Sequence, residues 1–151
     1  MKTEIIQYEP IHAYTILERN VREEDMWLSK YPDWEKWTKG WKDSGPAYTL
    51  VIDGEIVGCA GVVLMDWNRG EAWTLLSSLF YRYKKTVFKA IKNNLESIIK
   101  DKKLRRVQSL VYDGTEKICG NFLEHLGFEW EVKLEKYGPN GENLHLYKRI
   151  I

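Results

Sequence analysis

The amino-acid sequence predicts a single α+β domain over residues 1–151, with a central, mostly antiparallel mixed sheet of about seven strands and about four flanking helices. Three observations predict this class. A hairpin pattern surrounds Asp53-Gly54, apolar residues recur at helical spacing between Lys84 and Asp101, and short strand and helix patterns alternate elsewhere. A chain of this length can bury one hydrophobic core, and no linker-like segment divides it.

The first third of the chain is predicted to form one short strand followed by helices. Pro10 suits the first turn of a helix, where its missing N–H group would have no partner in any case. Trp34, Trp37 and Trp41 recur at i, i+3 and i+7, so they share one helix face, which we expect to face the core. The predicted elements are a strand at 4–8 and helices at 10–19, 21–29 and 33–42.

The centre is predicted to be an antiparallel meander that leads into a long helix. Asp53-Gly54 tolerates the positive φ angles of a type I′ turn and separates two strand patterns. Val87, Ile91, Leu95 and Ile98 form one apolar stripe with lysines opposite, which is typical of an amphipathic helix. The predicted elements are strands at 47–52, 55–64 and 71–79 and a helix at 84–101.

The last third is predicted to alternate strand, helix, strand and strand. Gly127 suits the end of a helix, and the segment 137–142, which contains Gly-Pro-Asn-Gly, has the composition of a turn. The predicted elements are a strand at 105–112, a helix at 115–126 and strands at 128–136 and 143–150.

Composition excludes several broad classes of protein. The formal net charge is +1, so no overall field attracts the chain to nucleic acid or to an anionic membrane. Cys59 and Cys119 have neither CxxC nor Cys/His spacing, which predicts reduced thiols and no metal site. No apolar run has the length of a signal peptide or a membrane span, so we expect a cytoplasmic protein.

The order of the predicted elements and two motifs resemble the GNAT superfamily of N-acetyltransferases. The segment 53–61 is similar to the family's central hairpin, and the residues His125-Leu126-Gly127-Phe128 are similar to the end of its penultimate helix. Within the superfamily the chain resembles a divergent group encoded by tailed bacteriophages. That likeness rests on the segment 73–78, before the long helix, and on 137–141, before the strand that carries His145.

The resemblance implies a V-shaped cleft, where the strands at 71–79 and 105–112 splay apart and acetyl-CoA binds. Unpaired backbone groups of about 74–78 would hydrogen-bond the pantetheine arm, as an added strand does. The pyrophosphate would lie at the N-terminus of the following helix. The implied cofactor-binding residues are Trp73, Thr74, Leu75, Leu76, Ser77, Ser78, Arg82, Lys84 and Lys85.

The segment 80–86 departs from the family pattern, because it lacks the glycines of the usual phosphate-binding loop. Arg82, Lys84 and Lys85 can supply charge in place of close backbone approach. The alternative is that this basic run is simply the solvated start of a helix.

A second departure lies at Leu123, where many family members carry a tyrosine that protonates the leaving thiolate. Leucine cannot donate a proton. Tyr112 and His125 are the nearest substitutes along the sequence, and the other alternative is that the thiolate departs unassisted.

Five residues are candidates for the chemistry of acyl transfer to an amine. Glu71 stands where family members often carry a catalytic glutamate, and His145 is the second candidate base; an exposed carboxylate and a hydrogen-bonded structural histidine are the alternatives. Glu24 and Asp25 are candidates to bind a cationic acceptor, unless they are ordinary charges at a helix start. Cys119 is disfavoured as a nucleophile, because no activating histidine is near it in sequence.

The sequence leaves two functions open. The first is an acetyl-CoA-dependent N-acyltransferase acting on an amine of a small molecule, peptide or protein, with a homodimer allowed. The second is a catalytically degenerate GNAT-like binding or structural module, such as a phage particle or host-interaction protein. The missing glycines and Leu123 favour the second function, whereas the intact strand before the long helix favours the first.

Overall fold

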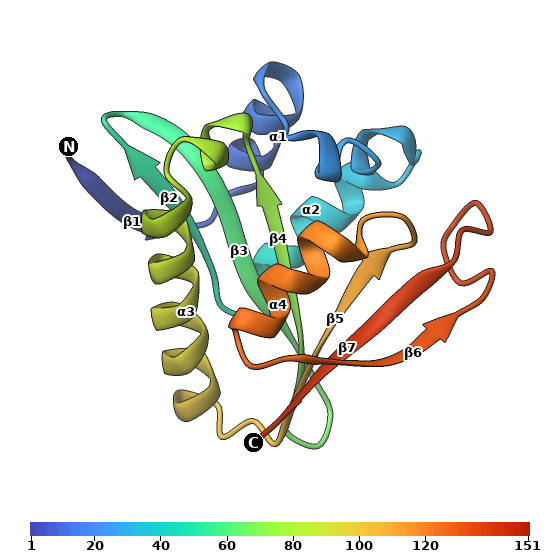
Figure 1. The fold of residues 1–151 in the computed structure, drawn as a ribbon. Coiled ribbons are helices and arrows are strands. Elements are labelled where there is room, and N and C mark those ends of the chain that lie inside the picture. Colours follow the sequence, from blue (N-terminus) through green and yellow to red (C-terminus); the bar gives the residue numbers. More distant parts are fainter.

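The computed structural model describes residues 1–151 and shows one seven-stranded mixed sheet with helices on both faces (Figure 1). The strand order is β1-β2-β3-β4-β5-β7-β6, and every neighbouring pair is antiparallel except β4 and β5. The strands are β1 (Thr3–Gln7), β2 (Ala47–Ile52), β3 (Glu55–Met65), β4 (Arg69–Leu76), β5 (Arg106–Tyr112), β6 (Glu129–Leu134) and β7 (Leu144–Ile150).

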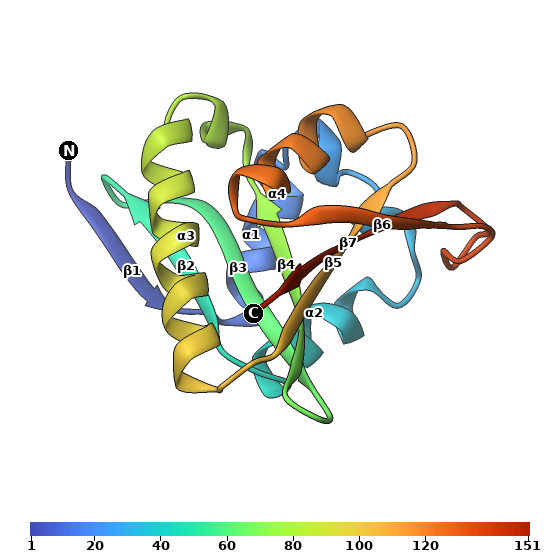
Figure 2. The ribbon, with the colours of Figure 1, turned by 60° about the horizontal axis from the view of Figure 1, so that its bottom comes forward.

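The helices form two layers around this sheet. Residues of α1 and α2 share a hydrophobic cluster on one face, and residues of α3 and α4 pack in clusters on the other (Figure 2). The α-helices are α1 (Pro10–Arg19), α2 (Trp34–Asp43), α3 (Lys84–Asp101) and α4 (Asn121–His125). Short helical turns are η1 (Glu23–Asp25), η2 (Leu28–Lys30) and η3 (Ser78–Tyr81), all 3₁₀, and η4 (Glu116–Gly120), a π-helical turn.

The predicted fold class and the order of the main elements are confirmed. Asp53 and Gly54 have φ angles of 49° and 80°, as a type I′ turn requires, and they join β2 to β3. The long helix has the predicted bounds. None of the helices combines the length and apolar composition needed to cross a membrane.

Three predicted elements are wrong in detail. The segment 21–29 forms two short 3₁₀ turns, because its backbone N–H group at Arg22 bonds to the carbonyl of Leu76 in β4. The helix predicted at 115–126 begins with a π-helical turn, in which Gly120 leaves room for the hydroxyl of Tyr147. The strand predicted at 71–79 ends at Leu76, since Ser77 instead caps η3 by accepting from the N–H of Leu79.

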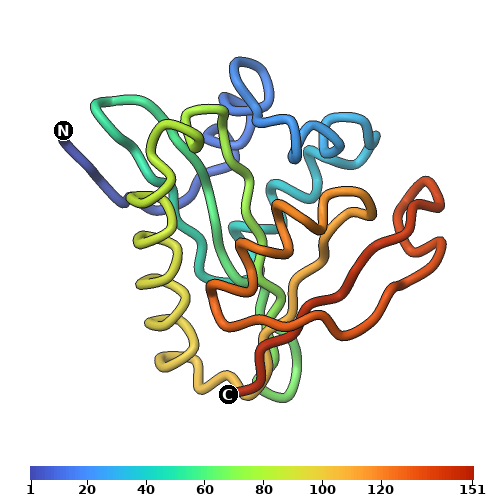
Figure 3. The backbone as a smooth tube through the Cα atoms, in the orientation of Figure 1, coloured from blue at the N-terminus to red at the C-terminus, as the bar shows by residue number.

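β4 and β5 pair only at their starts. Arg69–Glu71 of β4 pair with Arg106–Gln108 of β5. Beyond these residues β4 continues for five residues and β5 for four without pairing with each other. Figures 1 and 3 show the two strands diverging towards the end that carries η4. The expected V-shaped gap between these strands is therefore confirmed.

Candidate active site

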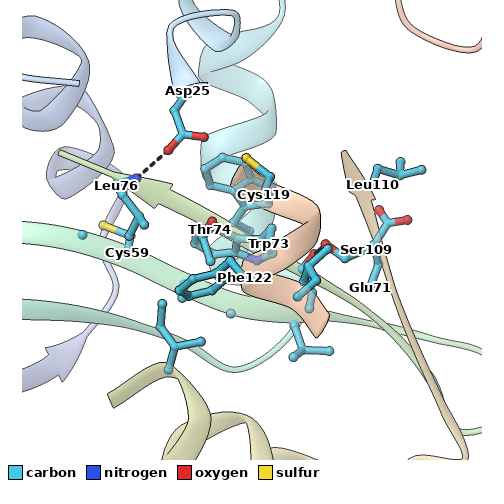
Figure 4. Close-up of a pocket in the computed structure, with 18 of the residues that line it drawn as sticks. Asp25, Cys59, Glu71, Trp73, Thr74, Leu76, Ser109, Leu110, Cys119 and Phe122 are labelled. Carbon is cyan, nitrogen blue, oxygen red and sulfur yellow. Dashed lines mark hydrogen bonds between the residues drawn. The ribbon is translucent and has the colours of Figure 1, made fainter. Parts of the chain in front are cut away.

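The gap between β4 and β5 opens into a cleft of about 580 Å³ (Figure 4). Its lining comes from both helix layers, and most of the lining residues are apolar. Thr74 contributes from β4, Ser109 and Leu110 from β5, and Cys119 and Phe122 from η4 and α4. The cleft is therefore bordered by residues on both faces of the sheet, those of α3 and α4 on one side and those of α2 on the other.

Thr74 presents the one open position on the edge of β4 that faces the gap. Alternation along the strand directs the backbone groups of Ala72, Thr74 and Leu76 towards β5, because Ser77 donates its N–H to Val57 in β3. The carbonyl of Ala72 accepts from Ser109 Oγ at 3.0 Å. Thr74 has neither a strand partner nor a side-chain hydrogen bond on this side.

The last residue of β4 is already held by the segment before α2. The N–H of Arg22 donates to the carbonyl of Leu76 at 3.0 Å, and Asp25 Oδ2 accepts from the N–H of Leu76 at 2.9 Å (Figure 4). Ser78 donates its N–H to the carbonyl of Asn20 at 2.6 Å. The expectation of unpaired backbone from 74 to 78 is therefore correct only at Thr74.

Arg22 and Asp25 form a buried ion pair that we call the Arg22–Asp25 clasp. Arg22 Nε donates to Asp25 Oδ2 at 2.8 Å, and the two residues are 6% and 5% exposed. Burial raises the pKa of Asp25 above the usual aspartate value, against the opposing effect of the guanidinium. Asp25 is thus neither a solvated helix charge nor free to meet a ligand. It fixes the end of β4.

Glu24 lies beside the clasp and is bound by a different neighbour. The hydroxyl of Tyr81 donates to the Glu24 carboxylate, with one oxygen at 2.6 Å. Partial burial acts to raise the pKa of Glu24, but the Tyr81 hydrogen bond, a backbone hydrogen bond and the charge of Arg22 together outweigh it, and the pKa lies below the usual range. Glu24 therefore stays ionised at neutral pH and borders the cleft.

The predicted basic run lies together at the start of α3. Arg82, Lys84 and Lys85 are exposed and line a second, smaller cavity of about 290 Å³ with Tyr81, Tyr83 and Thr86. None of the three cations forms an ion pair with a carboxylate. Their charge is available to an anion beside the N-terminus of the 18-residue helix.

Glu71 lies where the two strands part. Its Oε1 accepts from Gln108 Nε2 at 3.2 Å, across the last paired position of β4 and β5. The carboxylate is half-buried, lines the cleft, and has no cationic partner within the protein. This is the setting of a carboxylate that can accept a proton from a bound amine.

His145 lies in a separate cluster outside the lining of the cleft. Its Nε2 is 2.8 Å from Asp113 Oδ1 and 2.6 Å from Glu116 Oε1, and its Nδ1 accepts from Trp130 Nε1 at 3.0 Å. Because the indole donates to Nδ1, the proton is on Nε2 and points at the carboxylates. The three possible ligand atoms lie within 4.8 Å of one another, and in this tautomer the Nε2–H group donates to the carboxylates.

The two substitutes considered for the missing tyrosine are placed very differently. Leu123 is buried in α4. Tyr112 lines the cleft and donates to Tyr31 Oη at 3.0 Å, while burial raises its pKa to about 12. His125 lies outside the cleft lining, with Nδ1 2.7 Å from the carbonyl of Asn121. Of the two, only Tyr112 can contribute to the cleft.

An aromatic wall borders the α2 side of the cleft, and the sequence reasoning missed its position. The expectation that the helical tryptophans face the core is only partly correct, because Trp37 and Trp41 are half-buried and also line the cleft. Trp41 stacks on Trp73 of β4 with ring centroids 4.0 Å apart, and Trp27 packs on Tyr112 of β5 at 4.5 Å. The spacing of the tryptophans predicted a shared face, but not the opening beside it.

No protein-family model matches the chain, and no curated protein matches it in sequence. Solved structures do match it. A chimera of spermidine N-acetyltransferase from Vibrio cholerae has a TM-score of 0.74 at 11% identity, covering 99% of this chain and 96% of its own. The ribosomal-protein-S18-alanine N-acetyltransferase from Escherichia coli gives 0.73 at 14%, covering 99% and 94%. An acetyltransferase of the GNAT family from Bacillus anthracis gives 0.70 at 16%, covering 99% and 95%.

These matches extend over nearly the whole of each chain, so the protein has the GNAT fold. At identities of 11 to 16% the likeness establishes the fold and leaves the activity to be argued from the site. None of these three structures is described as a phage protein, and the resemblance to phage-encoded sequences stays a prediction.

Proposed function

We propose that the protein is an N-acyltransferase that takes an acetyl group from acetyl-CoA and passes it to an amine by direct attack. The observation that carries this proposal is the splayed end of β4 and β5, where Thr74 offers an unpaired N–H and C=O to a cleft of about 580 Å³. Each of the three solved structures reported above is an acetyltransferase, which supports the same activity.

The residues present fit acetyl-CoA at two points. Thr74 can pair with one amide of the pantetheine arm in the manner of an added strand. Arg82, Lys84 and Lys85 can hold the phosphates at the start of α3 by charge, in place of a glycine-rich loop. Four of the expected cofactor-binding residues already use their backbone N–H groups in hydrogen bonds within the protein, so these groups shape the site but are not free to bind the cofactor. The four are Leu75, Leu76, Ser77 and Ser78.

Bound acetyl-CoA supplies a thioester carbonyl that is open to attack by an amine. Glu71 is the proposed base, because it lines the cleft where the strands part and its only bonding partner is the neutral amide of Gln108. His145 has no part in this proposal, since its ring is held outside the cleft by Asp113, Glu116 and Trp130.

Direct attack is favoured over a cysteine-linked intermediate. Burial raises the pKa of the Cys119 thiol, even though the Arg22 guanidinium is 3.9 Å from its sulfur. A thiol that stays protonated is a poor nucleophile. The departing coenzyme A is itself a stable thiolate, so its release does not require a tyrosine at position 123.

The second candidate function is a catalytically degenerate binding or structural module, for example in a phage particle or at a host partner. The observation that favours it is the clasp on Leu76, which takes up backbone groups at the end of β4 that the family resemblance assigned to the cofactor. Leucine at position 123, in place of the family's tyrosine, favours the same candidate. The transferase is expected to bind acetyl-CoA, whereas the degenerate module is not.

Calorimetry and thermal unfolding with acetyl-CoA test the proposal. At a tenfold excess over the dissociation constant, mass action adds ~1.4 kcal/mol of stability and raises the melting temperature. The triple variant Arg82→Ala, Lys84→Ala and Lys85→Ala should bind at least tenfold more weakly. No heat and no melting shift at millimolar acetyl-CoA would reject the transferase and favour the module.

A control with the same change of charge separates local from general electrostatics. Lys92, Lys100 and Lys102 are exposed on α3 or directly after it, outside both cavities. Replacing these three by alanine should leave the affinity within about twofold, because the nearest of them, Lys92, lies about 10 Å of helix past Lys85 and charges beyond a Debye length of ~8 Å are screened. Equal losses in the two triple variants would mean that no phosphate site exists at the start of α3.

A further inference from the structure

The aromatic wall spans both sides of the gap. Side chains alternate along a strand, so Glu71 and Trp73 share one face of β4, about 7 Å apart along the strand. Tyr112 faces them from β5, and Trp27 packs on Tyr112. Trp41 stacks on Trp73 from α2. The α2 side of the cleft therefore presents several aromatic rings and, on the same face of β4, one carboxylate.

The lining of the cleft carries more negative than positive side chains, which favours the binding of a cation. The lining residues include three carboxylates, Glu24, Asp25 and Glu71, and one basic side chain, Arg22. Asp25 already pairs with Arg22, so two negative charges remain. Glu24 is bound to Tyr81 near α3, which leaves Glu71 as the carboxylate of the aromatic side.

No cation of the protein covers the rings of the aromatic wall. The cation–π contacts in the molecule are made by Arg22, Arg69, Arg82 and Lys84, each to a ring outside the wall. Aromatic faces that are free of protein cations are available to an organic ammonium ion. A carboxylate at their edge adds an ion pair for the same ligand.

Trp73 leaves a further polar group of the wall without a partner. Its Nε1 is the one buried side-chain nitrogen or oxygen in the protein that has no hydrogen-bond partner. Buried donors are nearly always satisfied, so this N–H group is unusual. Because an N–H donor cannot bond an ammonium group, this nitrogen does not contribute to binding a cation.

We infer that the α2 side of the cleft binds a primary ammonium ion carried on an apolar, ring-bearing body, with the nitrogen at Glu71 and the ring among the aromatic side chains. That such an amine is the acetyl acceptor rests on the proposed transferase function, whereas the binding of the amine to the cleft does not. A polyamine fits less well, because it has no ring to pack among the Trp and Tyr side chains and its further ammonium groups would find no second free carboxylate there.

Calorimetric titration without acetyl-CoA tests the inference with three probes. 2-Phenylethylamine carries the charge and the ring, 2-phenylethanol keeps the shape without the charge, and spermidine carries charges without a ring. The amine should bind at least tenfold more tightly than either of the other two. Glu71→Gln should weaken the amine at least tenfold and leave the alcohol unchanged, and Trp27→Leu should weaken both.

Matched controls carry the same substitutions outside the cleft. Glu55→Gln lies at the exposed start of β3, and Trp67→Leu replaces a tryptophan that is 72% exposed. Both should bind the amine like the unaltered protein. Thermal melting verifies the fold of each variant. If Trp27→Leu does not fold, the affinity of Glu71→Gln for the amine decides the test.

Three outcomes would overturn the inference: alcohol and amine binding within threefold of each other, tighter binding of spermidine, or an unchanged affinity in Glu71→Gln. Absence of binding by all three probes would overturn it as well. Because acetyl-CoA is left out, a failure of the coenzyme to bind does not affect this result. Conversely, acetyl-CoA binding without amine binding would reject only the acceptor class.

Discussion

Removing the carboxylate of Asp25 should destabilise the protein strongly. In Asp25→Ala the Arg22 guanidinium, only 6% exposed, loses its partner at 2.8 Å, and the N–H of Leu76 loses its acceptor. Leaving one member of a buried ion pair unpaired costs ~3–5 kcal/mol. For a domain of about this size, that loss lowers the melting temperature by roughly 6–20 °C. It is also a large share of a total stability of ~5–15 kcal/mol.

Urea unfolding followed by circular dichroism measures this loss, and two further variants interpret it. Replacing both members, as Arg22→Met with Asp25→Leu, removes the buried charges together and should recover most of the stability. Asp101→Ala removes an exposed aspartate paired with Lys102 and should cost less than ~1 kcal/mol. A loss below ~1 kcal/mol in Asp25→Ala, or a double variant less stable than that single one, would refute the reasoning.

Three other predictions concern the frame of the site. Gly61→Ala would place a Cβ 2.6 Å from the carbonyl oxygen of Pro46, so it should lower the free energy of unfolding in urea by ~1–3 kcal/mol. In Gly40→Ala of α2 the added Cβ meets nothing within 4 Å, so this variant should gain up to ~1 kcal/mol in the same measurement. Hydrogen bonds from Arg106 lower the pKa of Glu131 to about 2, below ~4.3 in the unfolded chain, so its stabilisation is present above pH ~4.3 and is lost as the pH falls towards 2. Glu131→Gln should flatten that part of the pH–stability curve. Burial raises the pKa of Cys59 to about 12, so a thiol reagent at pH 8 should modify Cys59 only after unfolding; rapid labelling of the folded protein would contradict this.

The elements that sequence predicted best are those fixed by local spacing. The stripe of Val87, Leu95 and Ile98 predicted α3, because all three residues recur at helical spacing and are buried. Asp53-Gly54 fixes the β2–β3 turn through backbone angles that few other residues adopt. Both patterns act within a few residues, so they can be read without knowing the rest of the fold.

The features that sequence could not predict depend on contacts between distant segments. Asp25 and Leu76 are 51 residues apart in the chain, and nothing near Asp25 indicates that its carboxylate caps a strand. The spacing of Trp37 and Trp41 is the same whether their face is sealed or borders a cleft. His145 alternates correctly on β7, but Trp130 of the neighbouring strand determines which ring nitrogen carries the proton.

The closed positions on β4 also restrict where a thioester could lie. Ala72 is held by Ser109 of β5, and Leu76 is held on the same edge of β4 by the clasp, so a strand-like guest can pair only with Thr74 between them. Backbone groups two residues apart on one strand edge are separated by about 7 Å, which leaves no freedom to slide by a register step. An arm bound at Thr74 would therefore have a single register on this strand. The clasp, which removes one backbone contact from the cofactor, would in this way fix the position of the arm along β4.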